Sequence, residues 1–342
     1  MKKSKPKQSG LFFSLTWEFL NNYLPNQECR SPVTVESYRD SLTVFRRYLI
    51  EDRHISIAAF RFSDCTKDCI FSFRDYLKRK GNKPSTINVR VTAVRSYLNY
   101  AADKDVSIQS VALLIAKIPR CKKIEKERPV LSETALAAVL DSPPHNKMGL
   151  RDRTILIVLY DSAARISELQ SVKLGDITLN GEFPSVLLHG KGDKERRAQL
   201  TDKSVGHLKQ YLHVFHADSP MEAYLFSTTI HGKTGMMSVS NLQRIVKQYT
   251  GIARETCSVL PESVHPHMFR RTRATNLYQD GVAIELVSAI LGHAKIETTK
   301  IYALPSLSQI RDAMESVPTP APDEEPLWIG SEDEMAHQCG LR

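Results

Sequence analysis

The segment that most constrains this chain lies between residues 265 and 302 and reads HPHMFRRTRATNLYQDGVAIELVSAILGHAKIETTKIY. Its first part contains His267 and Arg270, which stand among apolar residues at helical spacing. Residues three positions apart occupy the same face of a helix. The sequence therefore predicts a helix that presents an imidazole and a guanidinium side by side.

The second part of the segment predicts another helix over residues 283–291, which ends at Gly292. Glycine suits this position because it readily adopts the left-handed conformation of a helix C-cap. His293 follows the glycine, and Tyr302 stands nearer the end of the segment. Two imidazoles, a guanidinium and a phenol are thus expected to converge, a combination suited to attack of a tyrosine hydroxyl on a phosphodiester.

Two further motifs come earlier in the chain. Arg165 lies in Ala-Ala-Arg-Ile-Ser-Glu-Leu, with Glu168 one helical turn after it, and Lys191 lies in His-Gly-Lys-Gly-Asp-Lys-Glu-Arg. Together the motifs resemble the ordered pattern Arg, Lys, His-x-x-Arg, Leu-Gly-His, Tyr of the tyrosine recombinases, also called phage-type integrases. They span residues 160–303, and the chain before them fits the domain that precedes the catalytic domain in this family.

The resemblance implies that Arg165 and Arg270 bind the non-bridging oxygens of the scissile phosphate, because a guanidinium is planar, always charged and able to bind two oxygens at once. It also implies that His293 donates a hydrogen bond to the phosphate. Glu168 is expected to orient these groups without reacting itself. Read alone, His267 and His293 would be structural histidines, and only the joint pattern assigns them to a site.

The same resemblance implies that Tyr302 attacks the phosphorus and forms a 3′-phosphotyrosine. A free phenol has a pKa of about 10, so the nucleophile needs a proton acceptor, and His267 is the candidate base. Lys191, on a predicted hairpin, is the candidate acid for the leaving 5′ oxygen, with Lys194 as the alternative. Because the phosphotyrosine retains the bond energy and arginines supply the charge, no metal, ATP or other cofactor is expected.

The charge of the chain points to a polyanion as its partner. The net charge is +9, and residues 304–342 contain eight Asp or Glu against two Lys or Arg, so the chain before residue 304 carries +15. A strongly basic body of this kind suits DNA. The six cysteines form no paired framework, and no apolar run is long enough to span a membrane. These features predict an intracellular protein, and the resemblance implies a cytoplasmic bacterial one associated with the nucleoid.

Residues 11–103 are expected to be helical throughout, and they resemble the SAM-like, core-binding DNA-binding domain of the same family. Residues 104–130 predict an interdomain linker with a basic, proline-bounded end. The helices are expected over residues 11–24, 34–50, 62–80 and 84–102. Basic side chains in both segments are candidates for contacts with the DNA backbone, although each alone is equally well explained as a solvated charge. These candidates are Lys83, Arg90, Arg95, Lys122 and Lys123.

Residues 131–317 predict a mixed α+β catalytic domain, so that the expected fold is mainly α with a small antiparallel β-sheet. Helices are expected over residues 133–140, 150–164, 202–215 and from a cap at Ser240 to residue 251, and strands over residues 172–177, 185–189 and 197–200. An apolar stripe after Tyr302 predicts a short helix that packs on its own domain or on a neighbouring copy. Residues 318–342 predict an acidic, disordered tail.

The resemblance to the tyrosine recombinases implies site-specific recombination of double-stranded DNA at inverted-repeat core sites. The expected assembly is a homo-tetramer on DNA and a monomer in solution. Two alternatives remain open: a relaxing enzyme that resembles the type IB topoisomerases, and an architectural DNA-binding protein without activity. Docking of the C-terminal helix in a neighbour distinguishes the recombinase from a monomeric relaxing enzyme, and formation of a covalent adduct distinguishes either enzyme from the architectural protein.

Overall fold

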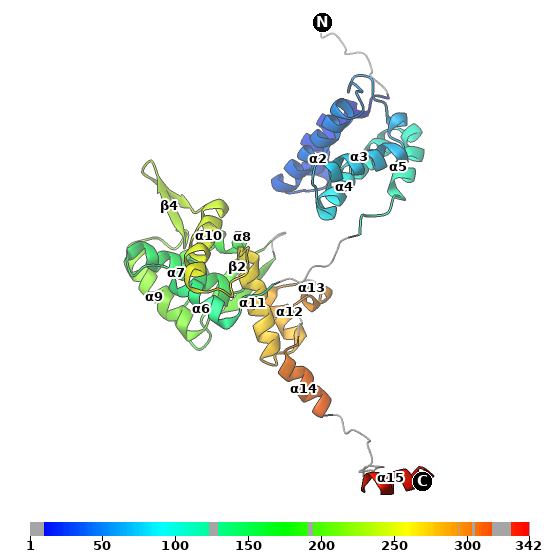
Figure 1. Ribbon diagram of the computed structural model, residues 1–342. Coiled ribbons are helices and arrows are strands. Elements are labelled where there is room, and N and C mark those ends of the chain that lie inside the picture. Colours follow the sequence, from blue (N-terminus) through cyan, green and yellow to red (C-terminus); the bar gives the residue numbers. More distant parts are fainter. Residues whose placement is uncertain are drawn as a thin grey trace. The chain divides into compact units, whose positions relative to one another are not determined.

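The computed structural model describes residues 10–122, 129–190, 194–293, 295–302, 305–316 and 330–341. The chain divides into two compact units, Met1–Glu127 and Arg128–Arg342 (Figure 1). Both units are mainly helical, and the strands of the described residues form two small antiparallel sheets in the second unit. The predicted fold class, mainly α with a small antiparallel sheet, is confirmed.

The first unit is a set of helices around an aromatic core. The ring of Phe12 lies 5.4 Å from that of Phe45 and 5.2 Å from that of Tyr97, and all three side chains are buried. Buried rings supply a large part of the apolar area that stabilises a domain of this size. The elements are η1 (Phe12–Leu15), α1 (Thr16–Glu18), the π-helix η2 (Phe19–Gln27), α2 (Pro32–Glu51), η3 (Phe62–Asp64), α3 (Lys67–Arg79), α4 (Pro84–Lys104), η4 (Val106–Ile108) and α5 (Gln109–Ala116).

The first unit differs from the sequence prediction at both ends. The single helix expected over residues 11–24 is divided among η1, α1 and η2, and η2 contains Pro25, which cannot donate a backbone hydrogen bond. The segment expected to be linker from residue 104 contains η4 and α5, whose Ile108 and Ile115 are buried in the core of this unit. The apolar spacing of these residues therefore reflects a fifth helix of the bundle.

The second unit packs α6, α7, α9, α10 and α11 around one core (Figure 1). Its elements are α6 (Glu133–Asp141), α7 (Lys147–Asp161), α8 (Ile166–Ser171), η5 (Leu174–Asp176), β1 (Ile177–Thr178), β2 (Ser185–His189), β3 (Glu195–Gln199), α9 (Asp202–Phe215), β4 (Ser227–Ile230), β5 (Lys233–Met236), α10 (Val239–Thr256), α11 (Pro266–Gln279), α12 (Ile284–Leu291), α13 (Glu297–Lys300), α14 (Leu307–Glu315) and α15 (Glu332–Gln338). Ser132 caps α6 by accepting a hydrogen bond from the backbone N–H of Ala135, as the sequence predicts.

The three-stranded sheet has the order β1-β2-β3, and the predicted pairing of the last two strands is present. Leu187 pairs with Arg197 and His189 with Glu195, so the predicted lysine lies in the segment of sequence that connects β2 to β3. Of the strand expected over residues 172–177, only Ile177 belongs to β1. The preceding three residues form the turn η5, in which the carboxylate of Asp176 accepts the backbone N–H of Lys173 at 2.8 Å.

Other differences concern single elements. The cap of α10 is Ser238, which accepts the backbone N–H of Asn241 at 3.1 Å, and the helix continues past Gly251 to Thr256. The hairpin of β4 and β5 was not expected, because its strands are mostly exposed and lack an apolar alternation. Within the tail expected to be disordered, residues 330–341 contain the helix α15, and residues 317–329 lie outside the described part of the chain.

Candidate active site

Arg165 and Glu168 form hydrogen bonds with each other at the start of α8. The backbone N–H of Arg165 donates to Oε2 of Glu168 at 2.9 Å, and its guanidinium donates to Oε1 at 2.5 Å. Burial alone would raise the pKa of the Glu168 carboxyl, but the hydrogen bonds from Arg165 and the charge of Arg196 lower it below its usual value. Glu168 is 4% exposed in its side chain and Arg165 is 45% exposed. The guanidinium is therefore oriented from inside while it remains open to a ligand.

The loop that leads to Arg165 contains an unusual backbone conformation. Ala163 has a φ of 47°, in the left-handed region that residues with a Cβ rarely occupy, and its side chain is buried. Its carbonyl oxygen accepts one hydrogen bond from Arg270 at 2.7 Å and another from Arg196 at 3.1 Å. Strained residues of this kind persist where the surrounding contacts over-determine them, as in functional sites.

Arg270, on α11, is completely buried. Besides Ala163, its guanidinium contacts the carbonyl oxygen of Leu291 at 2.6 Å and Nε2 of His293 at 3.0 Å. Burial lowers the pKa of Arg270 to about 10, with further lowering by the charges of Arg165 and Arg196, so the group stays charged at neutral pH. Its Nε–H has no acceptor in the part of the chain that the structure describes. The buried Nε–H groups of Arg74, Arg95 and Arg196 share this property, so the unpartnered donor does not by itself mark a ligand site.

His293 follows Gly292, whose φ of 65° ends α12 in the predicted left-handed conformation. Nε2 of His293 lies 3.0 Å from a nitrogen of Arg270, and Nδ1 lies 2.8 Å from Oγ1 of Thr299. An arginine can only donate, so Nε2 is the acceptor and the proton of the neutral ring is on Nδ1. Burial lowers the pKa of His293 to about 4, with further lowering by Arg270 and Arg165. This state differs from the prediction that His293 donates a hydrogen bond, because Arg270 occupies Nε2.

Tyr302 is 2% exposed, and its hydroxyl lies 3.3 Å from Nε2 of His267. The two residues come from different segments, since His267 is near the start of α11 and Tyr302 follows α13. Burial lowers the pKa of His267, and the nearby charges of Arg270 and Arg271 lower it further, so the ring is neutral and can accept a proton at neutral pH. The geometry thus brings together the phenol and the base that the sequence pairs.

Of the two lysines that are candidates for the acid, the structure describes only one. Lys191 lies outside the described residues, whereas the alternative, Lys194, is described and exposed immediately before β3. The backbone N–H of Gly190 donates to the carbonyl oxygen of Lys194 at 2.6 Å, which closes the turn between β2 and β3. The choice between the two lysines therefore still rests on the sequence pattern.

Arg196 joins this cluster although the sequence did not single it out. Its guanidinium contacts Oε2 of Glu168 at 3.3 Å, and the side chain is 12% exposed. A signal was present, because alternate residues of a strand share a face. Arg196 therefore shares a face with Ala198, which is buried in the core. An arginine on the buried face of a strand needs acceptors within the protein, and this departure from an apolar face is the signal that could have singled it out.

The candidates for DNA contacts in the first unit differ in how far their side chains are exposed. Lys83, at the N-cap of α4, and Lys122 are exposed, and Arg90 is partly buried on α4. Lys123 lies outside the described residues. Arg95 departs from the prediction, because its guanidinium donates to the carbonyl oxygen of Ile118 and holds the end of this unit. Burial lowers the pKa of Arg95, which is the environment of a packed residue.

Within the ranges that the structure describes, no three His, Cys, Asp or Glu side chains gather in a way that would hold a metal ion. No helix in the same part of the chain is long and apolar enough to cross a membrane.

Comparison with known families identifies both parts of the chain. Residues 129–307 match the phage integrase family, and residues 18–105 match the N-terminal SAM-like domain of phage integrases. The first of these ranges contains every residue of the cluster described above.

Curated relatives point to the same family. Tyrosine recombinase XerD of Staphylococcus aureus is 30% identical over 283 residues, which cover 81% of this chain and 90% of the relative. Tyrosine recombinase XerC of Staphylococcus carnosus is 28% identical over 283 residues, covering 81% of this chain and 88% of that protein.

Solved structures share the fold. The XerH site-specific recombinase bound to a palindromic difH substrate, in a post-cleavage complex, has a TM-score of 0.65 and 22% identity, covering 84% of this chain and 81% of that one. The Tn1549 transposon integrase in complex with transposon right end DNA has a TM-score of 0.66 and 16% identity, covering 88% of this chain and 99% of that one. By its motifs, its fold and its relatives, this chain belongs to the phage integrase family of tyrosine recombinases.

Proposed function

We propose that this protein is a site-specific recombinase that cuts and rejoins double-stranded DNA through a covalent bond to Tyr302. The observation that carries the proposal is the contact between the Tyr302 hydroxyl and Nε2 of His267, 3.3 Å apart, beside the buried Arg270. A nucleophile, a base and a fixed positive charge are the groups that attack on a phosphodiester requires.

In the proposed cleavage step, the Tyr302 oxygen attacks phosphorus while its proton passes to His267. The bond from phosphorus to the 5′ oxygen breaks, leaving a 3′-phosphotyrosine and a free 5′ hydroxyl. Rejoining reverses these steps with the 5′ hydroxyl of another strand, and His267 returns the proton. The lowered pKa of His267 supports its role as the acceptor, because the ring is neutral before the reaction.

The phosphate is proposed to bind between Arg165 and Arg270. Arg165 has an exposed guanidinium fixed by Glu168, and Arg270 has a buried Nε–H without an acceptor in the described part of the chain. Two guanidinium groups neutralise the charge on the non-bridging oxygens as the pentacoordinate transition state forms. For Nε2 of His293 to donate to the same phosphate, it must separate from Arg270 and take up a proton, because the proton of the neutral ring is on Nδ1. Binding of DNA is expected to cause this change.

The leaving 5′ oxygen needs a proton, and Lys191 is the proposed donor, with Lys194 as the alternative. Because each phosphotyrosine keeps the energy of the broken bond, the exchange requires no ATP. With arginines and a lysine supplying positive charge, the reaction as proposed also requires no metal ion.

The proposed assembly on DNA is a homo-tetramer that holds two duplexes at inverted-repeat sites, formed from monomers in solution. The exposed apolar side chains of α14 support it: Leu307 is 86% exposed and Met314 is 73% exposed. Within its own chain, α14 is held by a hydrogen bond of 2.9 Å from the Gln309 side chain to the carbonyl oxygen of Tyr278. An apolar face left in solvent is typical of an interface, and this face favours the recombinase over a monomeric relaxing enzyme.

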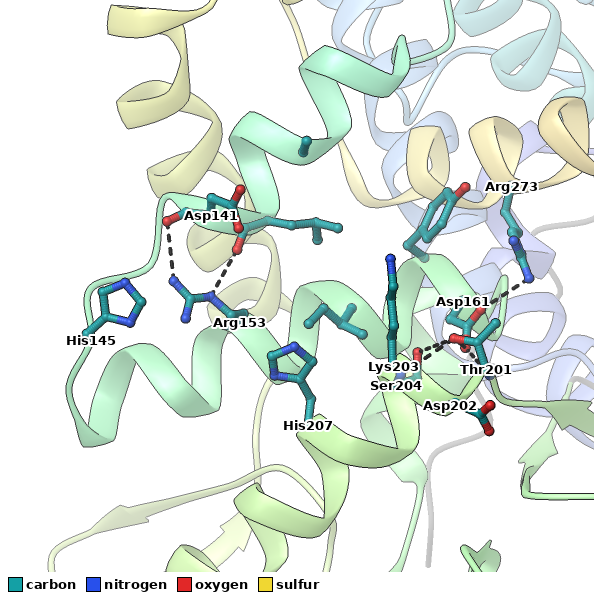
Figure 2. Close-up of a pocket in the computed structure, with 14 residues that line it drawn as sticks. Asp141, His145, Arg153, Asp161, Thr201, Asp202, Lys203, Ser204, His207 and Arg273 are labelled. Atoms are coloured by element: carbon teal, nitrogen blue, oxygen red, sulfur yellow. Dashed lines mark hydrogen bonds and ion pairs between the residues drawn. The ribbon is translucent and has the colours of Figure 1, made fainter.

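A cavity of about 800 Å³ between α6, α7, α9 and α11 is the proposed receptor for α14 of an adjacent copy (Figure 2). Leu140, Ile157 and Tyr160 give it an apolar lining. One side of the rim is fixed by Arg273, which pairs with Asp161 at 3.2 Å. Seating one helix in each neighbour would link the copies in a closed ring, as cyclic symmetry requires.

For the domains, we propose that the first unit, through α5, and the second unit, through α14, clamp the duplex. The basic segment that follows residue 118 is proposed as their linker.

The experiment that tests the proposed function uses a plasmid that carries the DNA flanking the protein's own gene. The reaction is stopped with SDS, and protein–DNA adducts are compared for the wild type and Tyr302→Phe. An adduct formed only by the wild type supports the proposal. Tight binding without any adduct favours the architectural protein.

A further inference from the structure

Arg196, the second residue of β3, lies where the separate segments of the active site meet. Its Nη1 donates to the carbonyl oxygens of Ile290 at 2.7 Å and Ser162 at 3.3 Å. Its Nη2 donates to the carbonyl oxygen of Ala163 at 3.1 Å and to Oε2 of Glu168 at 3.3 Å. One guanidinium thus connects the loop before Arg165, the carboxylate of α8 and the last turn of α12.

The stem of Arg196 packs on the turn that carries His293. A Cβ added to Gly292 would lie 2.6 Å from Cδ of Arg196, which is closer than two such atoms can approach. Glycine is therefore needed at this position both for its φ of 65° and for the passage of the arginine. The turn and the side chain fit each other closely, so a shift of one is expected to shift the other.

The need to donate to four acceptors explains why an arginine occupies this position. A guanidinium is a planar fork that serves several acceptors at once, whereas a lysine ammonium is a compact charge without that geometry. Burial lowers the pKa of Arg196, and the nearby Glu168 carboxylate opposes that effect. Both Nη atoms of Arg196 are engaged by the protein and its side chain is only 12% exposed, whereas the side chain of Arg165 is 45% exposed, so Arg165 is the more accessible of the two to a phosphate.

We propose that Arg196 is a positioning residue that locks the loop of Arg165 to the turn of His293, and thereby keeps the phosphate-binding groups in register. This inference rests on the proposed function. In this proposal Arg196 aligns the groups that bind the phosphate. The competing explanation is that Arg196 acts through Lys191, because it follows that lysine closely in the sequence. The two explanations predict different responses to a changed leaving group.

The first test measures adduct formation under saturating DNA with Arg196→Ala, Arg196→Lys and the control Arg197→Ala. Arg197 is the matched control because it carries the same charge on the exposed, opposite face of β3. We expect Arg196→Ala to lower the cleavage rate by about a hundredfold, the effect of misplacing reacting groups by an ångström. Arg196→Lys should restore little, and the affinity for a single site should be unchanged in all three variants.

A substrate with sulfur in place of the leaving 5′ oxygen separates the explanations, because sulfur leaves without a proton. If Arg196 aligns the phosphate, the sulfur substrate does not restore cleavage by Arg196→Ala. Restoration would show that the residue acts through the lysine and would overturn the inference. Full activity of Arg196→Lys would also overturn it, since charge alone would then be sufficient.

A second variant applies if Arg196→Ala does not fold. Gly292→Ala pushes against Arg196 while leaving that residue in place, so it should slow cleavage. If Arg196→Ala does not fold, unchanged cleavage by Gly292→Ala would overturn the inference. If it folds, the two substitutions together should slow cleavage by less than the product of their separate effects, because both act on one contact. Effects that multiply fully would contradict a shared role.

Hydrogen exchange without DNA separates failure of this inference from failure of the proposed function. The backbone N–H of His293 donates to the carbonyl oxygen of Ser288 at 3.1 Å and reports on the turn. Faster exchange in Arg196→Ala, but not in Arg197→Ala, supports the lock even if the wild type forms no adduct with any DNA. Unchanged exchange in Arg196→Ala overturns the inference even if the wild type cleaves DNA.

Discussion

The carbonyl oxygen of Ala163 accepts a hydrogen bond of 2.7 Å from the guanidinium of Arg270, which lies 107 positions later in the chain. The bond depends on the left-handed backbone of Ala163, which turns this oxygen toward the buried arginine. Through this contact, the loop that begins α8 and the helix α11 form one rigid support. The two arginines proposed to bind phosphate are thus positioned by the same few atoms.

The first prediction concerns the strained loop. Ala163→Gly should leave the free energy of unfolding within about 1 kcal/mol of the wild type, since relief of strain offsets the greater entropy of the unfolded chain. Ala163→Val should lower it by about 2 kcal/mol and reduce adduct formation, because a β-branched residue resists a positive φ. Chemical denaturation measures both. Equal stability of the two variants would contradict a strained conformation at this residue.

The second prediction concerns the carboxylate that the arginines share. Glu168→Gln should lower the free energy of unfolding by about 3 kcal/mol, because the buried charges of Arg196 and Arg270 lose their counter-ion. Glu182→Gln is the control, since Glu182 is exposed and a surface substitution changes stability by less than about 0.5 kcal/mol. If Glu168→Gln were as stable as this control, Glu168 would not organise the site.

The third prediction is a dependence of stability on pH. His293 has a folded pKa of about 4 against 6.5 in an unfolded chain, so between these values only the unfolded state gains a proton. Stability from this group is complete above pH 6.5 and is lost as the pH falls toward 4. His293→Gln should therefore show a smaller drop in Tm than the wild type between about pH 7 and pH 5.

His189 provides the control of opposite sign for this pH dependence. A hydrogen bond from its ring to Asp176 raises the pKa of His189, and Glu195 raises it further. Its contribution is complete below pH 6.5 and is lost as the pH rises through the folded pKa. His189→Gln should consequently enlarge the drop in Tm on acidification. A change of the same sign in both variants would contradict the hydrogen-bond pattern described for the two histidines.

The fourth prediction concerns assembly. Substituting Leu307 and Met314 by aspartate should weaken the complex of two DNA sites at least about tenfold, a loss of 1.4 kcal/mol, while binding to one site is unchanged. Asp312→Asn serves as the control, because residue 312 lies on the face of α14 opposite the apolar side chains. Native gel mobility with one-site and two-site DNA measures both steps. Equal loss of both would mean that α14 stabilises its own domain.

Sequence patterns predicted the elements that have strong local signals. The helix α9 has the predicted bounds of residues 202–215, and Gly292 ends α12 as its conformational freedom requires. Elements without such signals were missed, as β4 and β5 illustrate, since exposed strands carry no apolar alternation. Likewise, Gly251 lies within α10, because tertiary packing of Tyr249 and Ala253 outweighs the helix propensity of one residue.

The chemical groups of the site were accessible from the sequence, but their contacts were not. The pairing of His267 with Tyr302 follows from the order of motifs, whereas the state of His293 depends on which atom of Arg270 reaches it. Arg196 was missed because three of its four acceptors are backbone carbonyl oxygens, which every residue possesses and no motif records. Contacts of this kind depend on tertiary structure alone.

The most direct test of the account identifies the atom that binds DNA. Adducts formed by the wild type are digested with nuclease and protease, and the peptide that retains a nucleotide is sequenced by mass spectrometry. The account predicts a nucleotide 3′-phosphate on Tyr302 and on no other residue of the chain. A nucleotide on another tyrosine, or on a serine, would contradict the assignment of Tyr302 as the nucleophile and the mechanism built on it.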